Sequence, residues 1–140
     1  MLVKANKEHL DSILLIERES FNNPWSYASF LNELNSKVAS NWVYLKKTEL
    51  LGYIFGWNIE SEYYINNIAV SPNHRRKGVA LKLLNNIIDN LSISNLYLEV
   101  SRINNKAISL YEKIGFEKNG IRKNYYNNGT DAILYKMELK

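Results

Sequence analysis

Two side chains in the second half of the sequence, Glu99 and Tyr111, have the chemistry and the setting for proton transfer. Glu99 is the only charge in an otherwise apolar alternating segment, residues 95–100, which predicts a β-strand. Such a carboxylate is either a half-exposed strand residue or, at the mouth of a cleft, a general base for an incoming ammonium group. Tyr111 lies on the apolar side of a predicted helix. A core tyrosine is the simpler interpretation there, and a general acid is the alternative.

A cluster of positive charge lies in the middle of residues 65–91. An apolar strand pattern leads into Arg75, Arg76 and Lys77, then Gly78, and then apolar residues at helical spacing. The first turn of a helix has unpaired N–H groups and a partial positive charge, and glycine there lets an anion approach the backbone. The junction alone is also compatible with a solvated basic loop. With its three cations, it favours a site for a diphosphate.

Known phosphate-binding signatures narrow the kind of site. The GK[ST] of a P-loop is absent, and so is the dinucleotide pattern G-x-G-x-x-G. The junction instead matches V-x-P-x-x-[QR]-x-x-G-x-[GA] through Val70, Pro72, Arg75, Gly78 and Ala80. This pattern resembles the acetyl-CoA-binding motif of the GNAT superfamily of N-acetyltransferases. Ala80 stands where many members have glycine.

Composition excludes several other classes of protein. The 140 residues suit one domain spanning residues 1–140, and 46% hydrophobic with 23% charged residues is ordinary for a globular chain. Without cysteine there is no disulfide, thiolate metal site or cysteine nucleophile, and two histidines make a histidine-rich metal site unexpected. The net charge of +4 fits a polyanionic ligand or serves only solubility. The sequence has no signal-peptide pattern and no run as long as a membrane span, so we expect a cytoplasmic protein without a membrane partner.

The apolar periodicity predicts an α/β fold, a mixed and twisted sheet of about seven strands with helices on both faces. Strands are expected at residues 2–5, 41–47, 51–59, 63–70 and 95–100, and in a hairpin of residues 116–126 and 132–139 that turns at 127–130. Helices are expected after Asn6, over residues 26–35, over residues 78–91, and from Asn104 or Asn105 to Ile114. Three successive strands should form an antiparallel meander, and residues 95–100 should pair parallel to residues 63–70. Gly52 and Gly56 allow close approach or a bulge, and Trp25 is better explained as a staple between the first two helices than as the wall of an acceptor groove.

Residues 99–116 are similar to E-V-R-x-x-N-x-x-A-I-x-L-Y-x-x-x-G-F, a pattern of the RimI family of ribosomal-protein-alanine N-acetyltransferases within GNAT. Further similarities are NPWS at residues 23–26, NIAV at 67–70, RKNYY at 122–126 and DAI at 131–133. The resemblance therefore extends over essentially the whole chain. One departure is the tripeptide Ser101, Arg102 and Ile103, where the family usually reads Arg-x-x. This loop is expected near the acceptor groove, so the departure bears on peptide preference.

The resemblance implies that Glu99 is the general base and Tyr111 the general acid of acetyl transfer from acetyl-CoA. It also implies that residues 68–70 pair with the pantetheine arm like an added strand. Residues 76–81 would hold the pyrophosphate, and Asn104 would contact CoA. The predicted cofactor-binding residues are Ile68, Ala69, Val70, Arg75, Arg76, Lys77, Gly78, Val79, Ala80, Leu81 and Asn104.

The sequence thus predicts an acetyl-CoA-dependent protein Nα-acetyltransferase with no metal. The amine should attack the thioester directly, because the chain has no cysteine and these motifs contain no Ser/His pair. The resemblance implies that the partner and acceptor is the N-terminal alanine of the eighteenth small-subunit ribosomal protein. No direct binding of nucleic acid is expected. Two alternatives remain: acetylation of a small amine or polyamine, and a CoA-binding regulatory module. An acidic closed pocket would favour the small amine, and the presence of Glu99 and Tyr111 argues against the regulatory module.

Overall fold

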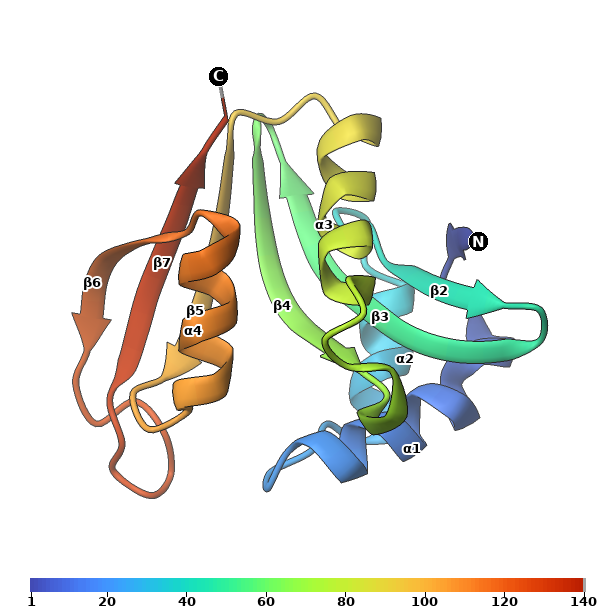
Figure 1. Cartoon of the computed structure of the whole chain (residues 1–140), viewed down its shortest axis with the longest axis horizontal. Helices are drawn as coiled ribbons and strands as arrows, with labels where there is room; N and C mark the ends of the chain where they lie inside the picture. Colours follow the sequence, from blue (N-terminus) through green and yellow to red (C-terminus); the bar gives the residue numbers. More distant parts are fainter. Residues whose placement is uncertain (140) are drawn as a thin grey trace.

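Seven strands form one mixed sheet in the order β1-β2-β3-β4-β5-β7-β6, with helices against both faces (Figure 1). The structure is a computed structural model, and it describes residues 1–139. The predicted α/β class, the approximate strand number and the arrangement of helices are confirmed. The strands are β1 (Leu2–Lys4), β2 (Trp42–Lys46), β3 (Glu49–Ile59), β4 (Glu62–Val70), β5 (Asn95–Ser101), β6 (Glu117–Arg122) and β7 (Ala132–Glu138).

The helices begin where the sequence predicts capping residues. Asn6 accepts a hydrogen bond from the Glu8 N–H and opens a short 3₁₀ turn that leads into the first helix. Ser26 accepts from the Ser29 N–H, and Asn104 from the Ala107 N–H, so all three predicted caps are confirmed. The helices are α1 (Leu10–Ser20), α2 (Tyr27–Leu34), α3 (Val79–Asn90) and α4 (Asn105–Ile114), with 3₁₀ turns η1 (Lys7–His9) and η2 (Pro72–His74). No helix within residues 1–139 is long and apolar enough to span a membrane.

The sheet separates two apolar cores. One core packs α3 and α4 against the middle of the sheet, and its buried residues include Leu83, Leu96 and Tyr111. The other packs α1 and α2 against the opposite face and includes Leu10 and Phe30. Burial of both faces explains why β3 reads as a nearly continuous apolar run rather than an alternating one.

A β-bulge at Asn66 changes which face β4 presents. Ile65 is opposite Gly56 and Asn67 is opposite Phe55, so Asn66 is the extra residue. Before the bulge, Tyr63 and Ile65 belong to the α3–α4 core. After it, Ala69 belongs to the α1–α2 core. Gly56 is required there, because a Cβ atom would lie within 2.4 Å of the Tyr63 ring, which confirms the predicted close approach.

Strands β4 and β5 pair only at one end and then diverge. Their parallel pairing, which the sequence predicts, runs from Glu62 opposite Asn95 to Tyr64 opposite Tyr97. Beyond that pair, β4 continues to Val70 and β5 to Ser101, and Figure 1 shows the two strands separating with α3 and α4 on either side. Each strand therefore presents an unpaired backbone edge toward the other.

The predicted C-terminal hairpin is present, but its first strand is shorter than predicted. Strand β6 ends at Arg122 rather than at residue 126, and β7 lies between β5 and β6, an order that the sequence did not predict. The ladder ends early because Asn124 adopts a positive φ of 54° and its N–H bonds to the Asp131 side chain instead of to a neighbouring strand. The turn at residues 127–130 is present, and it contains Gly129 at φ 81°.

Candidate active site

The start of α3 leaves its first N–H groups available to a ligand. No side chain caps the helix, and the first backbone bond of this helix runs from the Lys82 N–H to the Gly78 carbonyl, 3.0 Å. The N–H groups of Val79, Ala80 and Leu81 therefore project from the helix start. Gly78 has φ +82°, and a Cβ atom built on it would meet no heavy atom within 4 Å. This open backbone is what the predicted anion site would require.

The three cations before Gly78 have different settings. Arg76 and Lys77 are exposed beside the helix start. The Arg75 guanidinium is engaged by the protein: its Nε donates to the Val70 carbonyl, 3.0 Å, and its Nη2 donates to Ser20 Oγ, 2.9 Å. Arg75 thus links the end of β4 to the end of α1, and Arg76 and Lys77 are the side chains with the freer approach to an anion.

The unpaired edge of β4 ends next to this helix start. Ile68 and Val70 pack their side chains against the α3–α4 core, and Ala69 is buried on the opposite side. Their backbone groups remain for an extended ligand to use, which is the geometry that strand addition requires. The Val79 side chain is buried, so only its backbone can contact a ligand. The predicted contact at Asn104 comes from a residue whose side-chain oxygen already caps α4.

Glu99 lies on β5, on the opposite face from the buried Leu98 and Val100. Its side chain is 32% exposed, and its Oε1 lies 3.0 Å from Nε of Arg122 on β6. The carboxylate therefore lies just past the point where β4 and β5 separate, reachable from solvent and held by one ion pair.

Tyr111 is 9% exposed, and its ring packs edge-on against Phe116 at 5.9 Å between centroids. Within residues 1–139 its hydroxyl makes no side-chain hydrogen bond. Burial, with a smaller contribution from Tyr126, raises the pKa of Tyr111 to about 12. The hydroxyl is thus protonated at neutral pH, as both a general acid and a core tyrosine would be.

Tyr126 interacts electrostatically with both of these residues, and sequence reasoning gave it no role. Burial raises the pKa of Tyr126 above its usual value, with smaller contributions from the Glu99 carboxylate and Tyr125. Tyr126 also contributes to the raised pKa of Tyr111. It is therefore close enough to interact with both. The only signal in the sequence was the family-like stretch at residues 122–126, which assigns no function to its members.

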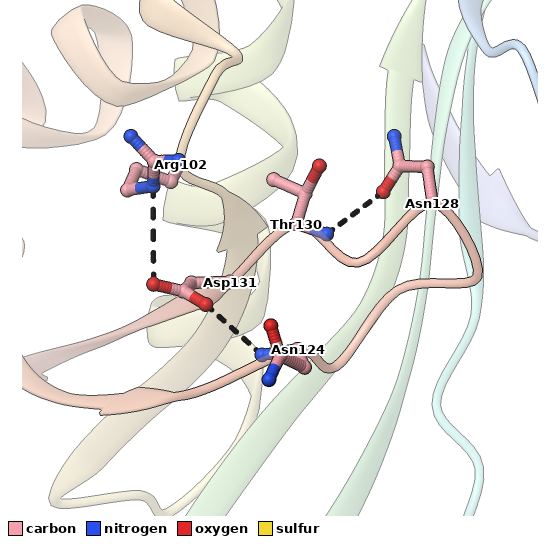
Figure 2. A network of polar contacts seen from close by, with 5 residues as sticks. All are labelled: Arg102, Asn124, Asn128, Thr130 and Asp131. Carbon is pink, nitrogen blue, oxygen red and sulfur yellow. Dashed lines mark hydrogen bonds and ion pairs between the residues drawn. The ribbon is translucent and has the colours of Figure 1, made fainter.

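The loops beside this cluster are tied together by Asp131 (Figure 2). The Asp131 Oδ1 accepts from the Asn124 N–H, 2.9 Å, and its Oδ2 lies 3.9 Å from Nε of Arg102. Its carbonyl accepts from the Arg102 N–H, 3.0 Å. The Asn128 side chain closes the turn by accepting from the Thr130 N–H, 3.0 Å. Arg102, within the tripeptide that departs from the family pattern, thus anchors the β6–β7 loop that carries Tyr126.

Trp25 acts as the predicted staple, although with different partners. Its ring packs against Phe30 at 5.1 Å and Phe55 at 6.4 Å between centroids, and its backbone N–H donates to Glu17 on α1, 2.9 Å. The ring therefore joins α2 to β3, and the backbone makes the contact with α1. A shallow hollow of about 240 Å³ lies beside it, lined by Trp25, Ser29, Asn32 and Glu33.

Comparison with known proteins identifies the class to which this fold and site belong. Residues 10–116 match the acetyltransferase (GNAT) family, and the chain belongs to that family of N-acetyltransferases. The chain is 34% identical, over 91% of its length and 87% of the relative's, to a Bacillus subtilis (strain 168) protein provisionally named [ribosomal protein bS18]-alanine N-acetyltransferase. It is 30% identical, over 95% of its length and 89% of the relative's, to an N-alpha-acetyltransferase of Saccharolobus solfataricus.

Solved structures agree with the family assignment. The ribosomal-protein-S18-alanine N-acetyltransferase of Escherichia coli superposes with a TM-score of 0.89 at 29% identity, over 100% of this chain and 94% of that one. Arabidopsis thaliana NAA60, whose structure is a complex with acetyl-CoA, has the same fold with a TM-score of 0.84 at 20% identity, over 99% of this chain and 98% of that one.

Proposed function

We propose that this enzyme is a protein Nα-acetyltransferase that transfers the acetyl group of acetyl-CoA to the N-terminal alanine of ribosomal protein bS18 in the cytoplasm. One observation carries the proposal. The open edge of β4 is followed, after the turn η2 and the basic loop, by the uncapped start of α3, and the strand β5 that diverges from β4 carries the Glu99 carboxylate. This is a place for an extended arm ending in a diphosphate, with proton-transfer groups at its other end. The names of the relatives supply the acceptor.

The cofactor would be held by backbone more than by side chains. Residues 68–70 would pair with the pantetheine amides, and the N–H groups at the start of α3 would bind the pyrophosphate beside Arg76 and Lys77. The Gly78 position is open enough for such an approach. Arg75 would act indirectly, by fixing the end of β4 against α1.

Glu99 and Tyr111 would divide the proton transfers. An α-amino group titrates near pH ~8, so at neutral pH it must lose a proton before it can attack the thioester. Glu99, exposed at the divergence of the strands, would accept that proton directly or through water. Tyr111, kept protonated by burial, would donate to the departing CoA thiolate.

The charge beside Glu99 favours a peptide over a small cationic amine. The hollow beside Trp25 and a second one, lined by Lys4, Ala5, Leu34, Ala39, Ser40 and Asn41, do not include Glu99 or Tyr111. The side chains nearest Glu99 include the cation Arg122, which would repel a polyamine. The ion pair offsets the charge of Glu99, unlike the acidic pocket expected for a small cationic substrate.

Intact-mass analysis tests the proposal. The enzyme is incubated with acetyl-CoA and a synthetic peptide of the bS18 N-terminus that begins with alanine, and the mass gain of one acetyl group is expected. The matched control is the same peptide with a blocked N-terminus, which should gain nothing. Spermidine tests the alternative acceptor. Acetylation of spermidine with none of the peptide, or acetylation of the blocked peptide on lysine, would refute the proposal.

A further inference from the structure

A carboxylate outside the proposed catalytic cluster is buried in the α1–α2 core. Glu17 on α1 is 1% exposed, although charged residues are almost never fully buried without partners. Its Oε1 accepts from the Tyr53 hydroxyl, 2.6 Å, and from Asn67 Nδ2, 2.9 Å. Its Oε2 accepts from the Trp25 N–H, 2.9 Å. One side chain thus receives three donors from three segments that are far apart in the sequence.

The donors belong to segments that matter for both substrates. Asn67 directly precedes residues 68–70, the proposed cofactor edge. Trp25 lies in the loop between α1 and α2, and Pro24 before it has no N–H to offer. Tyr53 is fully buried on β3, and burial followed by the Glu17 carboxylate raises its pKa well above the usual value, so its hydroxyl remains a donor. The carboxylate therefore connects a loop, a core strand and the cofactor strand.

The same loop lies at the open end of the site. Its first residue follows Ser20, whose hydroxyl accepts from Arg75, and Arg75 also donates to the last carbonyl of β4. Both hydrogen-bond connections place the α1–α2 loop next to the end of β4 that has diverged from β5. A buried carboxylate costs free energy that a packed apolar side chain would not, so a role beyond stability is the more economical explanation.

We propose that Glu17 is a positioning residue: its carboxylate holds the loop of residues 21–26 against β4, so that this loop and the cofactor edge keep one relative geometry. Glu17 contacts neither substrate, because its side chain is buried. The proposal rests on the proposed function in two respects, that residues 68–70 hold the cofactor and that the acceptor binds beside this loop.

Glu17→Gln in the full-length chain tests the role. An amide has one acceptor oxygen, so its NH₂ group must face either the Trp25 N–H or the donors from Tyr53 and Asn67. We expect the KM for the acceptor peptide to rise at least about tenfold while CoA affinity, measured by calorimetry, changes less than about threefold. The matched control is Tyr53→Phe, which removes a donor from Oε1 and leaves the Trp25 contact. It should lower the melting temperature and leave the peptide KM within about threefold.

Two further measurements decide the remaining outcomes. Hydrogen exchange should show that the Trp25 amide of Glu17→Gln loses protection at least about tenfold while core amides of β3 keep theirs. This readout needs no acceptor, so it stands if wild-type enzyme fails to acetylate the bS18 peptide, a result that would reject only the proposed function. If Glu17→Gln does not fold, Asn67→Ala, which cuts the link to β4 alone, is expected to raise the peptide KM severalfold. Unchanged peptide KM and unchanged Trp25 exchange in a folded variant, or a uniform loss of protection, would overturn the positioning role.

Discussion

Replacing Tyr111 with phenylalanine distinguishes its two proposed roles, general acid and core tyrosine, because only the hydroxyl is removed. The ring and its edge-on contact with Phe116 remain, and the hydroxyl makes no side-chain hydrogen bond within residues 1–139, so the free energy of unfolding should change by less than about 1 kcal/mol. With a pKa of about 12, the wild-type hydroxyl carries its proton at every pH of an ordinary assay. If that proton goes to the CoA thiolate, its loss should slow acetyl transfer by about 10²-fold, or about 2.7 kcal/mol in the transition state.

The assay is a single-turnover measurement of acetyl transfer, together with thermal melting and CoA calorimetry. A single turnover avoids a slow product-release step that could hide the effect in kcat. The control is Tyr135→Phe, another buried tyrosine of the same core, whose hydroxyl donates to Glu112 on α4, 2.8 Å. It should lose about 1–2 kcal/mol of stability and keep its rate. An unchanged chemical step in Tyr111→Phe, with a lowered melting temperature, would end the general-acid assignment and leave the core tyrosine.

Three further expectations follow from the same site. Gly78→Asp should weaken CoA binding by more than about tenfold in calorimetry, because a carboxylate would face the pyrophosphate; Gly129→Asp, at φ +81° and equally open, imposes the same backbone strain and should leave CoA affinity unchanged. Glu99→Gln should lower turnover by about 10²-fold near neutral pH, and turnover should recover partly at higher pH, where free amine is abundant. The control Glu62→Gln, on the same sheet, should keep wild-type turnover. A pH–rate profile of Glu99→Gln like that of wild type would exclude Glu99 as the general base. Folding raises the pKa of Tyr111, so its protonated hydroxyl contributes fully to the free energy of unfolding below about pH 10, and this contribution is lost as the pH rises toward about 12. In urea unfolding at a series of pH values, wild type should therefore lose about 2 kcal/mol more over that interval than Tyr111→Phe. Equal losses would contradict the burial.

Local features of this fold could be predicted from the sequence because neighbouring residues determine them. The caps at Asn6, Ser26 and Asn104 need only a side-chain oxygen and the N–H two or three residues later. Gly78 at the start of α3 could be predicted for the same reason, since its positive φ is a local property of the turn that begins the helix. The antiparallel meander followed from short turns, and the parallel pairing of β4 and β5 from the helix between them.

Features that depend on distant segments were not predicted. The position of β7 between β5 and β6 depends on which sheet edge is free, and the early end of β6 depends on Asp131 capturing the Asn124 N–H. Glu17 could be assigned to the buried side of α1 by its spacing, but its partners Tyr53 and Asn67 come from other strands. The Arg122 ion pair with Glu99 likewise joins β6 and β5 across β7, so it depends on a strand order that the sequence did not predict.

The bulge at Asn66 makes the length of β4 a constraint in its own right. If Asn66 were deleted, the pleat would run without interruption, and the Asn67 side chain would turn from Glu17 toward the α3 core. Ile68 would exchange places with it and meet a buried carboxylate. Without the bend of the bulge, β4 would also diverge less from β5. Homologous chains with this architecture should therefore accept changes of residue type along β4 more readily than the gain or loss of a single residue.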